Sequence, residues 1–242
     1  DYIGHNYGPR AIEIQDTYLR LDQDLARLLK ELDKKVGAGN YLVFLTADHG
    51  ASFVTQELID HKVNVNYFER DTFDLFVANE INKEFGLSNV IESITNHQIF
   101  LDEKTIAEKN VDLQKVEVFL AKKIMEFPGV YISNTSSDMK LGGYTDQRLM
   151  LQKGYNQKRS GNVLFLLNPG WRRFFKTTGT SHGSTYTYDT HVPFIVYGWG
   201  VNPGSTARKT WVEDIAVTIS SLLHINNPMG ATGEAVWEVV NK

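Results

Sequence analysis

The sequence predicts an α/β protein built on an open, mostly parallel β-sheet. Two short, continuous apolar runs, at 41–46 and 162–167, have the composition of strands that are buried on both faces of a parallel sheet. A third such run lies at 192–197, and a long helical pattern precedes the first. Helices that alternate with buried strands are typical of the α/β class, in which ligands bind at the carboxyl ends of the strands.

The first element is a helix expected at 10–35. Apolar residues recur there at intervals of three and four positions, which is the period of an amphipathic helix. Gly37 and Gly39 predict where it stops, because glycine is common just beyond a helix C-terminus. The strand at 41–46 follows, and the polar stretch that begins at Asp48 comes directly after it.

The middle of the chain, residues 55–159, has a more mixed pattern and is predicted to be an insertion or cap segment that shapes a substrate cleft. The flanking parts, 1–54 and 160–242, are assigned to the core of one domain. Secondary structure in and after the middle segment is expected as helices at 71–85, 103–126, 145–159 and 212–223, and as strands at 98–101 and 130–132.

The composition excludes some classes of function and some types of metal site, but it does not identify the function. The chain has 242 residues, 42% of them hydrophobic, which is enough to bury a core of its own. Its net charge of −4 argues against a nucleic-acid binder, since such proteins normally carry a basic surplus. There is no cysteine, so any metal must be held by histidine and carboxylate side chains. No apolar run approaches the roughly 18–20 residues that span a bilayer.

Asp48 and His49 are the most informative polar pair. They leave a buried strand and precede Gly50, whose backbone freedom allows a sharp turn. Adjacent side chains at a strand end point to opposite sides, so one of them could bind one metal ion and its neighbour a second. A capping aspartate followed by a structural histidine would give the same pattern, and both interpretations stay open.

Asp1, His5 and His182 are the other candidate ligands. Asp1 and His5 are four positions apart, so on a helical turn they could face one ion together. His182 lies among small residues at 179–184, where backbone and ligand can approach closely. Each also has an ordinary interpretation: a helix-start acid, a surface histidine and a histidine in a flexible loop.

The remaining histidines carry less information. His61, His97 and His224 have no acidic or glycine context, and surface or core positions are expected for them. A structural role is favoured for His191 over a hydrogen-bonding role behind a ligand, and Asp189 could orient a ligand histidine.

Three motifs, in this order, resemble the alkaline phosphatase superfamily: DYIGHNYGP at 1–9, TADHG at 46–50, and GTSHGSTYTYDTHVPFIVYG at 179–198. The likeness is closest to its single-chain, phosphate-irrepressible bacterial enzymes and to the related type I phosphodiesterase/nucleotide pyrophosphatases. The resemblance implies a three-layer α/β/α sandwich with a mostly parallel sheet. It also implies that this chain is the C-terminal portion of one catalytic domain, with an incomplete sheet, and that the protein is periplasmic or secreted.

In the resembled family, the positions of Asp1, His5 and His182 hold one zinc ion, and those of Asp48 and His49 belong to the other. A set of histidine and carboxylate ligands agrees with Zn²⁺, whereas Ca²⁺ and Mg²⁺ prefer oxygen alone. The family's Thr or Ser nucleophile, and a further Asp of the second site, are expected upstream of Asp1. The sequence therefore predicts one complete zinc site and no catalytic nucleophile in this chain.

The resemblance implies two-zinc hydrolysis of phosphate monoesters through a phospho-enzyme intermediate, with small phosphorylated substrates. The text GTSHGS followed by YDTHVP favours the monoesterase branch. Two alternatives stay open: a phosphodiesterase or nucleotide pyrophosphatase on the same scaffold, and a non-catalytic zinc-binding module. The chain by itself is expected to be inactive, and its oligomeric state is left open.

Overall fold

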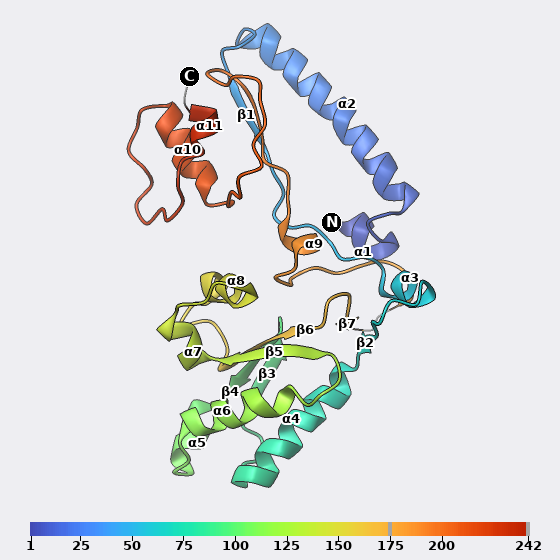
Figure 1. Ribbon diagram of the computed structural model, residues 1–242, viewed down its shortest axis with the longest axis vertical. Helices are drawn as coiled ribbons and strands as arrows, with labels where there is room; N and C mark the ends of the chain where they lie inside the picture. The colour runs from blue at the N-terminus through green and yellow to red at the C-terminus, as the bar shows by residue number, and fades with distance from the viewer. Residues whose placement is uncertain (174–175, 241–242) are drawn as a thin grey trace. The chain divides into compact units, whose positions relative to one another are not determined.

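The computed structural model describes residues 1–173 and 176–240 (Figure 1). The chain divides into two compact units. The first consists of Asp1–Asp16 and His49–His191, and the second of Thr17–Asp48 and the chain from Val192 onward.

The first unit is built on a four-stranded antiparallel sheet with the order β3-β4-β6-β5. All five residues of β6 are buried, which explains why its sequence is one continuous apolar run. The strands of this sheet, in order, are β3 (Ile91–Thr95), β4 (Gln98–Leu101), β6 (Val163–Leu167) and β5 (Val130–Thr135).

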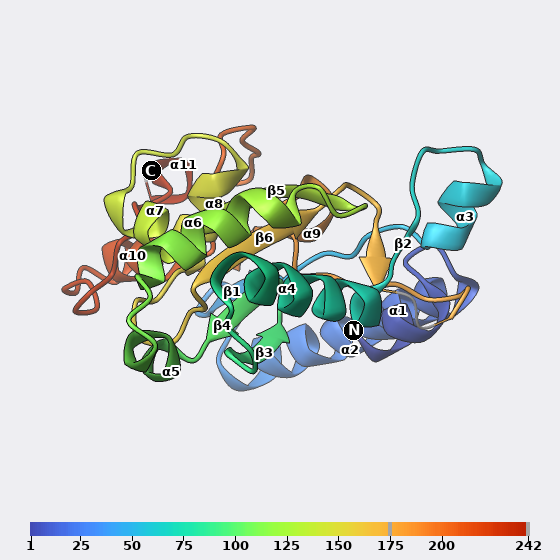
Figure 2. The same ribbon diagram turned by 90° about the horizontal axis from the view of Figure 1, so that it is seen from below.

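Two helices, α4 (Arg70–Phe85) and α6 (Leu113–Ile124), lie side by side over this sheet (Figures 1 and 2). Their inward side chains, among them the fully buried Phe73 and Leu120, join the sheet in one hydrophobic cluster. The single helix expected at 103–126 is wrong, because it is two helices. The first, α5 (Glu103–Glu108), ends before Asn110, which has a left-handed φ of 54°, and Asp112 then caps α6 through the Gln114 N–H.

The rest of the first unit consists of short elements. A small parallel pair joins β2 to β7, and helix α8 is shorter than the 145–159 expected. These elements are α1 (Tyr2–Tyr7), α3 (Thr55–Asp60), β2 (Tyr67–Phe68), α7 (Ser136–Leu141), α8 (Gln147–Gly154), β7 (Arg172–Arg173) and α9 (Thr187–Thr190).

The second unit contains most of the long helix α2 (Ile12–Lys35), which confirms the helix predicted at 10–35. It also contains a two-stranded sheet of β1 (Leu42–Leu45) and β8 (Ile195–Gly198). Helices α10 (Asp214–Leu222) and α11 (Trp237–Val240) follow.

The direction of strand pairing differs from the prediction. The mixture of helices and strands is that of the α/β class, but β1 and β8 run antiparallel, and within 1–173 and 176–240 only the short β2–β7 pair is parallel. An apolar run indicates that a strand is buried, but it does not indicate whether the neighbouring strand is parallel or antiparallel. The alternating exposure of β8, with Ile195 and Tyr197 about half exposed, is typical of a strand with one covered face.

The segment 55–159 supplies three of the four strands of the first unit's sheet, and β6 is the fourth. The interpretation of that segment as a cap that shapes a substrate cleft stays a prediction. Among the helices of the described residues, none is long and apolar enough to cross a membrane.

Candidate metal centre

Asp1 and His5 lie one helical turn apart. Asp1 precedes α1 and its carbonyl accepts a hydrogen bond from the His5 N–H at 3.0 Å, which closes the first turn. Their side chains share one face, as the i, i+4 spacing predicts, and Asp1 Oδ1 is 3.2 Å from His5 Nε2.

The His5 ring is fixed by the loop that precedes His182. His5 Nδ1 is 3.0 Å from the carbonyl oxygen of Thr180, and because a carbonyl can only accept, Nδ1 must carry the proton. Nε2 of the neutral ring is then unprotonated and can bind a metal, which is the usual arrangement of a ligand histidine. The Thr180 N–H in turn donates to the Gly4 carbonyl at 3.1 Å, so α1 and this loop are joined by two hydrogen bonds.

Glycine is required at position 179 for this approach. Gly179 has a φ of 78°, and a Cβ placed on it would lie 2.1 Å from the His5 carbonyl oxygen. Both the backbone conformation and the close packing exclude a larger residue, so the first glycine of the loop sets the distance between His182 and α1.

His182 completes a triangle of ligand atoms. Its Nε2 is 3.2 Å from His5 Nε2 and 3.4 Å from Asp1 Oδ1. In a tetrahedral zinc site with bonds of about 2.0–2.1 Å, two ligand atoms are separated by about 3.3–3.4 Å. The three atoms therefore have the spacing of ligands that share one ion.

His49 lies beside the same group. Its Nδ1 is 2.8 Å from the Gly50 carbonyl oxygen, which again leaves Nε2 as the unprotonated nitrogen of a neutral ring. That Nε2 is 3.8 Å from Asp1 Oδ1, and the ring stacks on His182 with centroids 3.4 Å apart. Asp1, His49 and His182 can each bring one ligand atom within 4.8 Å of the others, so this group could also hold a metal ion.

The backbone that follows His49 and His182 is held by residues 188–189. The Gly50 N–H donates to the Asp189 carbonyl at 2.7 Å, and a Cβ at Gly50 would lie 2.2 Å from the Tyr188 carbonyl oxygen. The buried Asp189 carboxylate accepts from the backbone N–H of Ser184 at 2.8 Å and from its hydroxyl at 2.5 Å. Asp189 thus orders the loop just after His182.

The structure brings four of the five predicted ligands together: Asp1, His5, His49 and His182, all in the first unit. Asp48 ends the second unit and directly precedes His49 in the chain. The assignment of Asp1, His5 and His182 to one ion, and of Asp48 and His49 to another, stays a prediction.

Two residues near the cluster gave no separate signal in the sequence. Thr180 binds His5 through its carbonyl, and its buried hydroxyl lies 2.9 Å from the Ser52 hydroxyl and also donates to the Ser52 carbonyl. Thr180 stands inside the motif that contains His182, which is the only hint of its role. Ser52, two residues beyond Gly50, has no such pattern.

Comparison with known proteins gives the family. The family model for type I phosphodiesterase/nucleotide pyrophosphatase matches residues 1–191. Three curated relatives are each 37% identical: alkaline phosphatase PafA of Elizabethkingia meningoseptica, a calcium-transporting ATPase of Myroides odoratus, and alkaline phosphatase PhoV of Synechococcus elongatus. The matches cover 99–100% of this chain and 43–44% of those proteins, so the chain spans less than half of their length.

A solved structure agrees. The crystal structure of wild-type alkaline phosphatase PafA matches with a TM-score of 0.90 and 36% identity, over 99% of this chain and 46% of that one. This match confirms the predicted alkaline-phosphatase-like fold class. By its sequence motifs and its fold, the chain belongs to the type I phosphodiesterase/nucleotide pyrophosphatase family.

Proposed function

We propose that this chain provides metal ligands to a two-zinc enzyme that hydrolyses small phosphate monoesters. The observation that carries the proposal is the triangle formed by Asp1 Oδ1, His5 Nε2 and His182 Nε2, whose sides of 3.2–3.4 Å match the edge of a tetrahedral zinc site. In this proposal these three residues hold one zinc ion, and Asp48 and His49 belong to the second.

The donor set supports zinc over other metals. Two imidazole nitrogens and one carboxylate oxygen form a borderline site, which suits Zn²⁺ better than the all-oxygen sites of Ca²⁺ and Mg²⁺. Zinc bound there would act as a Lewis acid toward the oxygens of a phosphoryl group. The chain's own part is to keep protons on Nδ1 of His5 and His49 through the Thr180 and Gly50 carbonyls, so that each Nε2 faces the cluster.

Two relatives named alkaline phosphatase support the hydrolysis of phosphate esters. A preference for monoesters, a phospho-enzyme intermediate and a periplasmic or secreted location are further parts of this proposal. The description of the family model favours a second candidate, hydrolysis of phosphodiesters or nucleotide pyrophosphates on the same scaffold. No nucleophile is assigned in this chain under either candidate.

Zinc binding tests the ligand set first. The chain, freed of metal and then titrated with Zn²⁺, is expected to bind it, and His182→Ala is expected to lose the site because it removes one corner of the triangle. His61→Ala is the matched control, since His61 is exposed and its Nδ1 contacts the Glu57 carbonyl of the preceding helix. Equal zinc content in wild type and His182→Ala would contradict the ligand role.

Turnover tests the reaction. Hydrolysis of p-nitrophenyl phosphate and of bis-p-nitrophenyl phosphate would be measured with zinc-loaded protein, both as this chain and in a longer form where one is found. Little turnover is expected of this chain, because no nucleophile is assigned to it. In the longer form, faster hydrolysis of the monoester is expected, and faster hydrolysis of the diester would favour the second candidate. Zinc binding without turnover in any form would reject the hydrolase and leave a non-catalytic zinc-binding module.

A further inference from the structure

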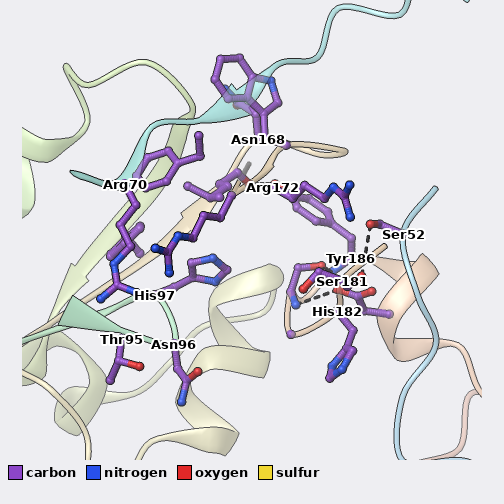
Figure 3. A pocket seen from close by; sticks show the side chains of 18 of the residues that line it. Ser52, Arg70, Thr95, Asn96, His97, Asn168, Arg172, Ser181, His182 and Tyr186 are labelled. Carbon is purple, nitrogen blue, oxygen red and sulfur yellow. Dashed lines mark hydrogen bonds between the residues drawn. The ribbon is translucent and has the colours of Figure 1, made fainter. Parts of the chain in front are cut away.

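A cavity of about 360 Å³ lies in the first unit against the loop that carries His182. Figure 3 shows Arg70 and His97 on one side of it and Ser181 and His182 on the other. Its volume is within the range of small-molecule sites. Of the clustered candidate ligands, His182 alone is part of the lining, so the cavity meets the cluster at that residue.

The lining of the cavity is cationic. It contains three arginines, Arg70, Arg172 and Arg173, and a single carboxylate, Asp189. One oxygen of Asp189 is already engaged, because it accepts both hydrogen bonds from Ser184. The arginines of the lining outnumber its carboxylates, and Asp74, outside the lining, is the acid that interacts with Arg70 and Arg173.

Apart from Asp189, Arg172 is the most buried of the charged residues in this lining. It is only 6% exposed, and its Nη2 donates to the backbone carbonyls of Lys176 and Thr178 at 2.8 and 3.2 Å. Its Nε is buried without a partner, and within residues 1–173 and 176–240 no carboxylate forms an ion pair with it. Burial lowers the pKa of this guanidinium, although nearby Tyr67 opposes the effect. A buried cation without a counter-ion is unfavourable, and a bound anion would remove that cost.

Arg70 is held in place at the first turn of α4. Its Nη2 donates to the Ile94 carbonyl at 2.5 Å, and its Nε is 3.5 Å from Asp74 Oδ2. The side chain is about one-third exposed, so Asp74 neutralises it only in part. The carbonyl contact keeps the guanidinium oriented, which lowers the entropy lost when it binds an anion.

Aromatic rings form the rest of the wall. The cavity is lined by Phe68, Phe73, Phe165, Trp171 and Tyr186 beside the arginines. Phe68, Phe73 and Phe165 pack against one another with centroids 5.0–6.3 Å apart, which makes this wall rigid and apolar. A ligand with a planar apolar body and an anionic end fits both parts of the lining.

We propose that this cavity binds the leaving group of the substrate and selects phosphate esters whose leaving group has an apolar body and a second anionic group. This inference rests on the proposed phosphatase function, because the first phosphoryl group is placed at the zinc cluster. The second anion, either a carboxylate or another phosphate, is placed at Arg70, Arg172 and Arg173.

The test compares three probes that share one aromatic body. Binding of phenyl phosphate, 4-carboxyphenyl phosphate and 1,4-phenylene bisphosphate to the zinc-loaded chain would be measured by calorimetry. At least one of the two probes with a second anion is expected to bind about tenfold or more tightly than phenyl phosphate, the size expected of a charge-assisted contact. The tighter of the two identifies the anion.

The variants are Arg70→Gln, Arg172→Met and, as a matched control, Arg159→Gln. Arg159 is exposed and does not line the cavity, so its replacement makes the same change in net charge elsewhere. Arg70→Gln is expected to lose most of the preference for the second anion, whereas Arg159→Gln is expected to keep both that preference and the affinity for phenyl phosphate. Arg172→Met is also expected to lose the preference for the second anion. Its thermal unfolding would show whether the variant is folded. If Arg172→Met is unfolded, Arg70→Gln alone tests the second-anion site.

The outcomes separate the two proposals. Equal binding of all three probes to a chain that binds zinc and phenyl phosphate would overturn the leaving-group site and leave the proposed function standing. An equal loss of preference in Arg70→Gln and Arg159→Gln would also overturn it, because the effect would then be one of net charge. A chain that binds neither zinc nor phenyl phosphate would reject the proposed function, and the inference with it.

Discussion

Glu117 is a buried carboxylate whose protonation should control the stability of the first unit. It lies in α6, is 2% exposed, and its Oε1 accepts from the Ser136 hydroxyl at 3.0 Å and from Asn162 Nδ2 at 3.1 Å. Burial raises the pKa of Glu117 above its ordinary value of 4.5, although the two hydrogen bonds lower it. Ionisation of the folded protein is therefore less favourable than ionisation of the unfolded chain.

The sign of the pH dependence follows. A carboxyl group with a raised folded-state pKa contributes stability that is fully present below the unfolded pKa and is lost as pH rises through the folded pKa. Glu117→Gln keeps an acceptor oxygen and cannot ionise. The variant should gain stability relative to wild type as pH rises above about 4.5, and the difference should level off once Glu117 is ionised in the folded protein.

Glu117→Leu gives the size of the hydrogen-bond contribution. It removes the acceptor of Ser136, while Asn162 keeps a bond to Glu103 at 2.8 Å. Each buried donor that loses its acceptor costs about 1–3 kcal/mol. The free energy of unfolding is therefore expected to fall by about 2–4 kcal/mol. At roughly 2–4 °C per kcal/mol for a chain of this size, the Tm should fall by about 4–16 °C.

The assay is urea unfolding of wild type, Glu117→Gln and Glu117→Leu at several values between about pH 4 and pH 8. The quantity compared is the difference in free energy of unfolding between wild type and Glu117→Gln. A difference that stays constant with pH, or that shifts in favour of wild type as pH rises, would refute the conclusion that burial raises the pKa of Glu117.

Three further predictions concern other parts of the chain. Gly179→Ala should destabilise the chain by more than about 2 kcal/mol and weaken zinc binding, because its Cβ would meet the His5 carbonyl at 2.1 Å; calorimetry measures both effects. Tyr186→Phe should cost about 1–3 kcal/mol in urea unfolding, since it leaves the buried Leu167 carbonyl without its 2.7 Å donor. Asp214→Ala should cost about 2–4 kcal/mol in urea unfolding, because the buried carboxylate accepts two backbone N–H bonds in the second unit.

Matched controls make these tests specific. Gly154→Ala is expected to be neutral or slightly stabilising, because nothing lies within 4 Å of its Cβ position at the end of α8. Tyr131→Phe and Asp22→Asn change exposed side chains and should alter the free energy of unfolding by less than about 0.5 kcal/mol. Losses as large as those of the site variants would contradict the assigned contacts.

The sequence predicted elements well where one local pattern dominated. The helix at 10–35 and the runs that became β1 and β6 were found because their periodicity or continuous apolarity is unambiguous. The break between α5 and α6 was missed because a left-handed Asn110 and a capping Asp112 interrupt a helix without breaking its apolar pattern. The pairing of β6 with β4 and β5 was not predicted, because partner and direction depend on contacts between distant residues.

The candidate site, too, could be predicted from the sequence only in part. The types of ligand and their loops could be named from three motifs, since chemistry and spacing are local properties of a sequence. The stacking of His49 on His182 could not, because it depends on how residues 188–189 hold Gly50. The cavity arginines were missed for a related reason: Arg70 and Arg172 are about a hundred positions apart and belong to no motif.

The distances along the chain between the candidate ligands affect how the protein matures. Asp1 and His5 are close neighbours in the sequence, but His182 lies 177 positions beyond His5, so long-range folding is needed to bring them together. The cluster is therefore a product of folding rather than a nucleus for it, and metal loading would be a late step in biogenesis. An ion captured then would join the beginning of the chain to a loop some 175 residues away. Such a long-range cross-link should slow unfolding, so the metal-free chain should have a shorter lifetime than the metal-loaded chain.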